Sequence, residues 1–280
     1  MLASYLNSQD SDSAQSYTLS PGVYSYLLIG GGGGGTYEYL NSECEQHDVR
    51  VNAAGGGSGF IIKGRVVIAE GDVVQMVVGV GGISDTTNAS AGLPTSLVVN
   101  GVTIATAMGG QGASRETPVM DKRVGYLHRI SKGGSGLCGG GSSTGDVPMA
   151  GNGIVRIAAG SGGKNGGNGA GAKFENITIV EGGHGYCEGY LDTLQQSIDP
   201  TIYHTGEFVN SDSGMSIVSL SNDTLLDTVN VAGGGAGYGH TYHGALYRGE
   251  KIDGCGWGAG GGGGHNGVRG YASLIRLTGE

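Results

Sequence analysis

Hydrophobic and polar positions alternate along the chain in short runs, which is the pattern of β-strands rather than of amphipathic helices. The segments FIIKGRVVI (60–68), VVQMVVGV (73–80) and YASLIRL (271–277) are dense in β-branched residues, which favour strands. Only YLDTLQQSI (190–198) has the composition of a short helix. The pattern therefore predicts an all-β protein. Its predicted strands span 17–19, 23–29, 58–68, 73–80, 95–99, 102–107, 153–158, 176–180, 216–220, 227–231 and 270–277.

Runs of glycine recur between the predicted strands. Glycine accounts for 62 of the 280 residues, whereas its usual share is about 7%. The runs are irregularly spaced, so they do not indicate a solenoid. They also lack the Gly-X-Y period of collagen, and the chain has only 5 prolines. The runs lie at 30–35, 55–59, 109–112, 133–141, 160–171, 181–185, 233–239 and 254–264.

Packed polyglycine II helices would explain why six glycines follow one another at 30–35. Each buried backbone N–H and C=O needs a partner. In an extended helix of about three residues per turn, these groups point to neighbouring helices, and a side chain would block any face that meets a neighbour. Mobile linkers between β modules are the alternative interpretation. The predicted scaffold glycines include Gly30, Gly31, Gly32, Gly33, Gly34, Gly35, Gly260, Gly261, Gly262, Gly263 and Gly264.

Composition and charge narrow the function classes. Hydrophobic residues make up 38% of the chain and charged residues 14%, so the chain has enough apolar residues to fold. The formal net charge of −9 argues against a nucleic-acid partner, which needs clustered Lys and Arg. The start of the chain does not have the features of a signal peptide, and nowhere do about 18 apolar residues run together. The widely spaced Cys44, Cys138, Cys187 and Cys255 suggest free thiols made in a reducing cytoplasm.

Five stretches resemble the glycine-rich domain at the tips of bacteriophage tail fibres. YTLSPGVYSYLLIGGGGGG (17–35) has a strand with Pro-Gly-Val that leads into a glycine tract. AAGGGSGFIIKGRVVIAEGDVVQMVVGVGG (53–82), GLPTSLVV (92–99) and AMGGQG (107–112) continue the pattern. GGGGGHNGVRGYASLIRL (260–277) is similar to the closing tract and last strand of such domains. The chain thus resembles the separate adhesins of T-even-type phages.

This resemblance implies a fold and a domain organisation. The expected fold is a short-stranded, β-sandwich-like base combined with a packed bundle of polyglycine II helices. Residues 17–280 would form the glycine-rich receptor-binding domain, and residues 1–16 an N-terminal arm that serves as a possible attachment segment. We interpret the long insertions at about 36–52, 113–132 and 186–230 as loops outside the scaffold.

The resemblance also implies a tail-fibre or tail-tip adhesin that recognises a bacterial outer-surface protein or glycan. The expected location is the virion, after synthesis in the host bacterial cytoplasm. Further expected partners are other phage fibre or tail proteins. The chain would act as a homotrimer or as a single copy on a trimeric fibre. The alternative function is a structural virion protein, such as a fibre-tip cap or head decoration, without direct receptor contact.

Tyrosine is the main candidate for receptor contact. The chain has 14 Tyr against 3 Phe and 1 Trp, and many tyrosines lie in or beside the insertions. Tyrosine offers rigid contact area and a hydroxyl group at low entropic cost. Alternatively, these rings cover the half-wet sides of the glycine scaffold. The candidate receptor-binding residues are Tyr37, Tyr39, Tyr186, Tyr190, Tyr238, Tyr242, His243, Tyr247 and Trp257.

Enzymatic and cofactor chemistry has weaker support. His240, His243, Cys255 and His265 invite a zinc site, but their spacing does not show that they converge. GSGLCG (134–139) matches a dinucleotide motif only by chance, since no βαβ unit surrounds it. We therefore expect no catalytic residue, no metal and no cofactor. Carboxylates that could pair for glycan hydrolysis are better interpreted as solvated: Asp10, Asp12, Glu43, Glu45, Asp192 and Asp199.

Overall fold

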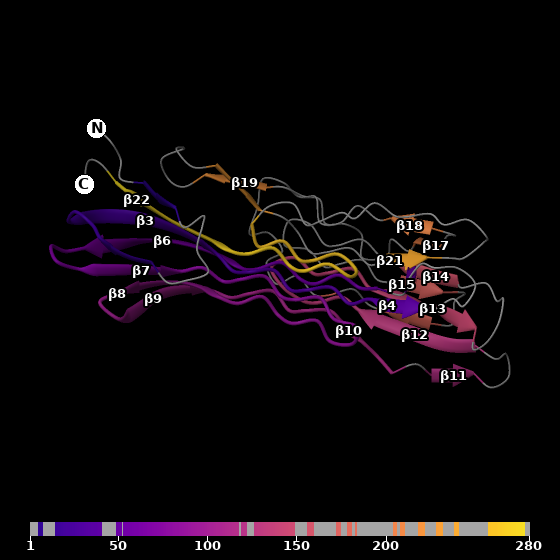
Figure 1. Cartoon of the computed structure of the whole chain (residues 1–280). Coiled ribbons are helices and arrows are strands. Elements are labelled where there is room, and N and C mark those ends of the chain that lie inside the picture. The colour runs from indigo at the N-terminus through magenta and orange to yellow at the C-terminus, as the bar shows by residue number, and fades with distance from the viewer. Residues whose placement is uncertain are drawn as a thin grey trace.

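The chain is elongated, with strands at both ends and extended glycine-rich segments between them, as Figure 1 shows. The structure is a computed structural model. Its described part contains strands and no helix, which confirms the all-β prediction there. The described residues are 5–7, 15–40, 49–51, 53–117, 119–121, 126–148, 156–159, 172–174, 178–180, 183, 204–205, 208–210, 218–221, 228–231, 238–240 and 257–277.

Two four-stranded antiparallel sheets form the end of the molecule that holds the first and last strands. We call it the near end. The first sheet has the order β1 (Tyr5–Asn7), β22 (Tyr271–Arg276), β3 (Gly22–Ile29) and β6 (Ile61–Ile68). The second has the order β2 (Gln15–Thr18), β7 (Val73–Val77), β8 (Thr95–Val99) and β9 (Val102–Ala107).

One hydrophobic cluster joins these two sheets. Because successive side chains of a strand point to opposite faces, every second residue reaches it. A second cluster lies on the other face of β3, where Leu27 and Ile29 pack with Ile61, Leu137 and Tyr271. Alternation on β3 therefore buries both faces of one strand. The fully buried members of the first cluster include Tyr24, Leu28, Val74, Met76, Leu97 and Leu274.

Two predicted strands at this end are longer than the observed ones. Residues 58–60 and 78–80 were expected to belong to strands, but β6 begins at Ile61 and β7 ends at Val77. Ser58, Gly59 and Phe60 donate backbone hydrogen bonds to three different segments instead of one neighbouring strand. The backbone is extended both in strands and in these glycine-rich segments, so the local residue pattern did not distinguish the two.

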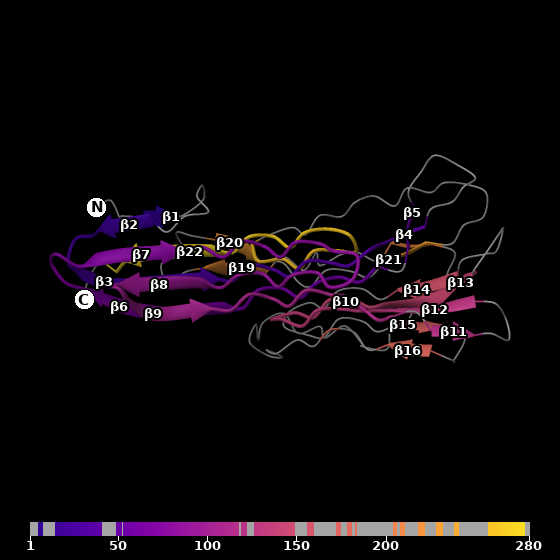
Figure 2. The ribbon, with the colours of Figure 1, turned by 60° about the horizontal axis from the view of Figure 1, so that its bottom comes forward.

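A second group of strands lies at the opposite end of the molecule, which we call the far end (Figure 2). Its largest sheet has the order β10 (Ser114–Arg115), β12 (Tyr126–Lys132), β13 (Ser143–Pro148), β14 (Arg156–Ala159) and β17 (His204–Thr205), and β11 (Val119–Asp121) also pairs with β12. Two hairpins accompany it, β4 (Glu38–Leu40) with β5 (Val49–Val51) and β15 (Ala172–Phe174) with β16 (Thr178–Val180), and so does a pair of strands that are distant in sequence, β18 (Phe208–Asn210) with β21 (Tyr238–His240). A separate hairpin joins β19 (Val218–Ser221) to β20 (Thr228–Val231).

These strands correct the interpretation of the insertions as loops. The ranges 36–52, 113–132 and 186–230 each contain paired strands, such as β4 with β5 and β12 with β13. Pairing gives their backbone N–H and C=O groups partners that a bare loop would lack. The short helix expected at 190–198 lies outside the described residues.

The described residues of the N-terminal arm also belong to the sheets. Residues 1–16 were expected to lie outside the scaffold, yet Tyr5–Asn7 pairs with β22, and Gln15 and Ser16 pair with β7. Each segment extends the edge of a sheet, where unpaired backbone groups would otherwise face solvent. In the part of the chain that is described, no helix is long and apolar enough to span a membrane.

Candidate functional site

The glycine-rich segments between the two ends pack around one central tract, residues 30–36, which is completely buried. Its N–H groups point to three neighbouring segments in turn, and the order repeats every three residues. Gly30, Gly33 and Thr36 donate to the segment 54–60, at the oxygens of Phe60 (2.9 Å), Gly57 (2.8 Å) and Ala54 (2.9 Å). Gly31 and Gly34 donate to Leu93 and Ser90, and Gly32 and Gly35 donate to Val268 and His265.

The carbonyl groups of the central tract follow the same repeat, with two further neighbours and again with the segment 258–270. Gly31 and Gly34 accept from Gly110 and Ala113, at 2.9 Å each. Gly33 and Thr36 accept from Gly261 (2.8 Å) and Gly264 (2.9 Å), and Gly32 accepts from Gly82 (2.7 Å). Among the described residues, three segments therefore accept from the tract and three donate to it, and because 258–270 does both, the tract has five different neighbours. We call this arrangement the glycine lattice, and it comprises residues 30–36, 54–60, 78–84, 88–94, 108–113, 133–142 and 258–270.

Close approach of these neighbours explains the six consecutive glycines. A β-carbon added to Gly32 would lie 1.8 Å from the oxygen of Ala259, and one added to Gly33 would lie 2.0 Å from the oxygen of Gln111. The corresponding distances at Gly30, Gly31, Gly34 and Gly35 are 2.0, 2.2, 2.5 and 2.1 Å, each to a backbone oxygen. No side chain fits at such distances. Glycine is therefore required at every position of the run.

Outer segments of the glycine lattice carry side chains where a face meets solvent. Met108 and Gln111, three residues apart, are exposed. In contrast, a β-carbon on the glycine that follows each of them, Gly109 or Gly112, would lie 2.0 Å from a backbone oxygen of the segment 88–94. Ile83 and Leu93 are likewise exposed, so their side chains also lie on faces that meet solvent. Sequence reasoning missed 78–84 and 88–94 as lattice segments, although glycine or alanine at every third position was a usable signal.

Hydroxyl side chains fix the segments where they meet the sheets. Thr95 Oγ1 accepts from the Gly79 N–H (3.0 Å) and donates to the oxygen of Ile29 (2.6 Å). Ser58 Oγ accepts from the N–H of Cys138 (2.9 Å), whose buried side chain forms no disulfide. The other cysteines, Cys44, Cys187 and Cys255, lie outside the described residues.

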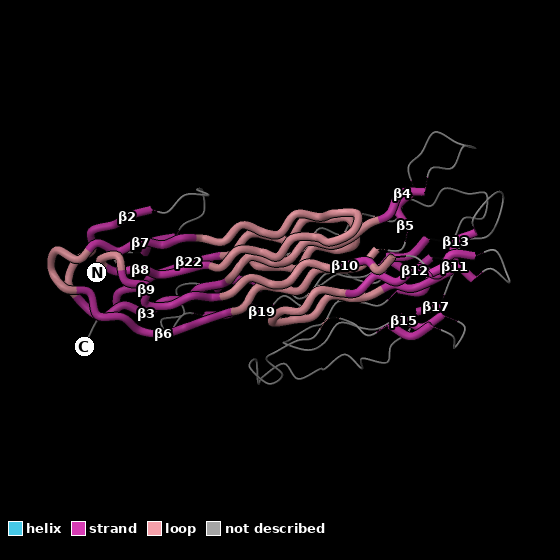
Figure 3. Tube along the Cα trace, turned by 90° about the horizontal axis from the view of Figure 1, so that it is seen from below, coloured by secondary structure: helices cyan, strands magenta, loops and turns pink. Residues whose placement is uncertain are grey.

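Candidate receptor-binding residues divide between the two ends. Tyr37 follows the central tract and is half-buried. Tyr39 lies in β4 opposite Arg50, and Tyr238 lies in β21 opposite Asn210. In Figure 3 the lattice segments run between the two groups of strands, and Figure 1 places β4 and β21 together at the far end. Five candidates lie outside the described residues: Tyr186, Tyr190, Tyr242, His243 and Tyr247.

Trp257 differs from the expectation of a receptor-binding loop. Its ring packs beside Tyr271, with centroids 5.6 Å apart and an interplanar angle of 37°. Both residues belong to the second hydrophobic cluster, which lies where the lattice meets the first sheet. The structure therefore separates Trp257 from the tyrosines at the far end and gives it a packing role.

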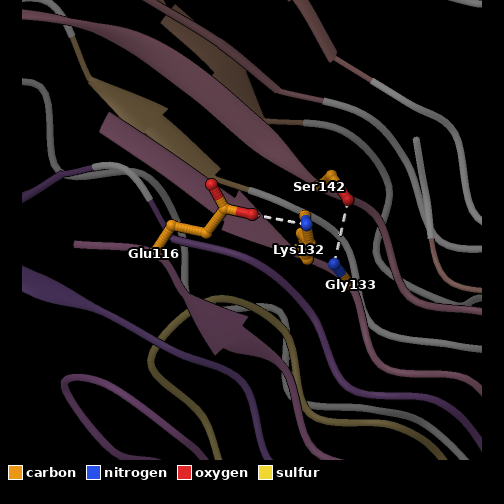
Figure 4. A network of polar contacts seen from close by, with 4 residues as sticks. All are labelled: Glu116, Lys132, Gly133 and Ser142. Atoms are coloured by element: carbon orange, nitrogen blue, oxygen red, sulfur yellow. Dashed lines mark hydrogen bonds and ion pairs between the residues drawn. The ribbon is translucent and has the colours of Figure 1, made fainter. Parts of the chain in front are cut away.

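Polar contacts join the lattice to the far-end sheet (Figure 4). Lys132 forms an ion pair with Glu116, and both side chains are exposed, so the pair adds little stability. Ser142 Oγ accepts from the Gly133 N–H at 2.9 Å, where β12 passes into the next lattice segment. The Glu116 N–H also donates to the oxygen of Ile130 (2.9 Å). Backbone contacts thus fix this junction more than charge does.

Metal ligands do not gather among the described residues, where no three His, Cys, Asp or Glu lie close enough to hold an ion. His265 donates its backbone N–H to the oxygen of Gly262 (2.9 Å). His243 and Cys255, two of the four residues that invited a zinc site, lie outside the described part.

Comparisons with known proteins add no family assignment, since no family model and no curated protein sequence matches the chain. Function must therefore be inferred from the geometry described above.

Proposed function

We propose that the glycine segments are packed polyglycine II helices that join a β-sandwich-like base to a receptor-binding end. The observation that carries this proposal is the central tract, whose hydrogen-bond partners repeat every three residues. A polyglycine or polyproline II helix has about three residues per turn and no internal hydrogen bonds, so its N–H groups turn to successive neighbours in the same way. The shared core of the two near-end sheets supports the base.

The protein is then an adhesin at a bacteriophage tail fibre or tail tip, and it does not act as an enzyme. Support comes from the arrangement of its ends. The first and last strands lie at the near end, whereas Tyr39 and Tyr238 lie in strands at the far end. A rigid scaffold lowers the ordering cost of binding and lets exposed segments vary. The far end meets a protein or glycan of the bacterial surface, and the near end meets other tail proteins.

Saturable binding of the purified, labelled chain to host cells tests this proposal. We expect binding that virus particles compete away. A chain with Tyr39→Ala and Tyr238→Ala should bind about tenfold more weakly or worse, as expected when aromatic contact residues are lost. The matched control carries Met108→Ala and Leu93→Ala, which truncate exposed side chains of the lattice. It should bind like the unchanged chain.

One result would contradict the adhesin function, and another would contradict the role of its far end. If the folded chain does not bind, the alternative of a structural virion protein is favoured, and the tyrosine variant should then impair particle assembly instead. If both variants lose binding equally, the far end has no special role.

A further inference from the structure

Residues 85–88, which we call the Asp85 turn, lie where two lattice segments leave for the far end. Asp85 forms a parallel bridge with Thr36, and its carbonyl oxygen accepts from the Tyr37 N–H at 3.2 Å. On the other side, the oxygen of Thr87 accepts from the Arg115 N–H at 2.7 Å. The turn therefore contacts the residues that follow the central tract and the segment 108–113, at the point where both segments leave the lattice.

The carboxylate of Asp85 determines the shape of this turn. Its Oδ1 accepts from the backbone N–H of Thr87 (2.7 Å) and of Asn88 (3.1 Å). Such contacts from an Asp side chain to the following backbone fix a turn. They hold the pKa of Asp85 below its usual range, and the nearby charge of Arg115 acts in the same direction.

Both exits lead directly into far-end strands. The central tract continues through Tyr37 into β4, which contains Tyr39. The segment 108–113 continues into β10, whose residues Ser114 and Arg115 pair with the end of β12. Two parts of the far end that are distant in sequence are thus placed relative to one another by one short turn.

We propose that Asp85 is a positioning residue for the receptor-binding end. It fixes the separation of β4 and β12 without contacting the receptor itself. The inference rests on the proposed function, because it concerns how that end is held in its binding conformation.

Three variants test the role of the carboxylate oxygen. Asp85→Ala removes the acceptor, whereas Asp85→Asn keeps an Oδ1 acceptor and removes the charge. Asp72→Ala is the matched control at the near end, where Asp72 Oδ2 accepts from the Ala69 N–H at 2.7 Å in another exposed turn. Two measurements apply to each variant: hydrogen exchange of the Tyr37 and Arg115 amides, and binding to host cells.

For Asp85→Ala we expect these two amides to exchange about tenfold faster, since a lost hydrogen bond shifts a local equilibrium by about that factor. Exchange at Gly30–Gly35 should be unchanged, which shows that the lattice is intact. Cell binding should weaken by about the same factor. Asp85→Asn should preserve both properties, and Asp72→Ala should leave both unchanged.

Unchanged exchange at Tyr37 and Arg115 in Asp85→Ala would overturn the inference. Faster exchange with full binding would overturn the positioning role, and equal losses in Asp85→Ala and Asp85→Asn would show that charge acts instead of the acceptor. If the unchanged chain does not bind host cells, the proposed function fails and the inference fails with it. If that chain binds and Asp85→Ala binds equally well, only the inference fails.

Discussion

Glycine has two different roles in this chain. In the central tract it leaves room, since a β-carbon at Gly33 would meet the backbone of Gln111 at 2.0 Å. At Gly71 and Gly101 it supplies a positive φ, of +85° and +79°, while the space around a β-carbon is open. A substitution in the tract displaces a neighbouring segment, whereas one in a turn strains only its own residue.

Gly33→Ala should therefore destabilise the protein by about 3 kcal/mol or more, since neither side of the contact has a flexible side chain that can yield. Gly71→Ala should cost about 1 kcal/mol from its left-handed backbone alone. Urea unfolding followed by circular dichroism measures both costs. Equal stability of the two variants would show that the tract is loosely packed.

At this scale the sequence revealed the glycines but not their neighbours. The run at 30–35 could be recognised because six glycines in a row are typical only of close-packed backbone or of a mobile linker. Val80, Ser90 and Leu93 were not assigned to the lattice in advance, because side chains on the outer faces of these segments hide the small residues that recur at every third position beside them. Their backbone groups bond to the lattice as those of glycine do.

At the scale of single elements, side-chain hydrogen bonds hold two turns of the near end together. Asp72 Oδ2 accepts from the Ala69 N–H, and its Oδ1 accepts from Asn100 Nδ2 at 2.7 Å. Asn100 Oδ1 in turn accepts from the Val73 N–H at 2.9 Å. Asn100 and Gly101 both have positive φ, as in the two-residue hairpin turns that match strand twist. The β6–β7 and β8–β9 turns are thus joined.

This tie should weaken in acid. Hydrogen bonds from the Ala69 backbone and the Asn100 side chain hold the pKa of Asp72 below its usual range. A lowered folded-state pKa stabilises the fold above the unfolded-state value of about 3.9, and this stabilisation is lost as pH falls through the folded-state pKa. The free energy of unfolding should therefore fall more steeply below about pH 4 in the unchanged chain than in Asp72→Asn. Urea titrations from neutral pH to pH 3 test this, and parallel curves would contradict it.

Strands were predictable where apolar alternation was long, as in β3 and β6. The sequence missed β4, β5 and β10, because strands of two or three residues are too short to show a period. The far-end arrangement was not predictable either, since β18 pairs with β21 across a long separation. Pairing between strands so far apart depends on tertiary packing, which a local residue pattern does not reveal.

At the scale of the molecule, the lattice ties together distant parts of the chain. Asn266 Oδ1 accepts from the Ser84 N–H at 2.8 Å, across 182 residues. The central tract has neighbours from both halves of the sequence. Its set of contacts is complete only when the segment 258–270 has joined it, which suggests slow and highly cooperative folding.

Hydrogen exchange should show this cooperativity. Amides of Gly30–Thr36 should exchange only through global unfolding, because every one is buried and bonded to another segment. Amides of β9, the last strand of its sheet, should exchange by local opening at lower free energy. Exchange mass spectrometry across a range of urea concentrations separates the two. If the amides of the central tract and of β9 exchanged with the same free energy at low urea, the central tract would not be specially protected.

The three-residue repeat of the central tract also restricts how the scaffold can change in length. Insertion of one residue would turn every following N–H toward the wrong neighbour, while three residues would restore the pattern and, with the polyglycine II geometry that we propose, add about 9 Å. Each adjoining segment would have to grow by the same amount to remain in step. The distance between the near and far ends is therefore quantised, and evolution can alter it only by coordinated triplet insertions or deletions.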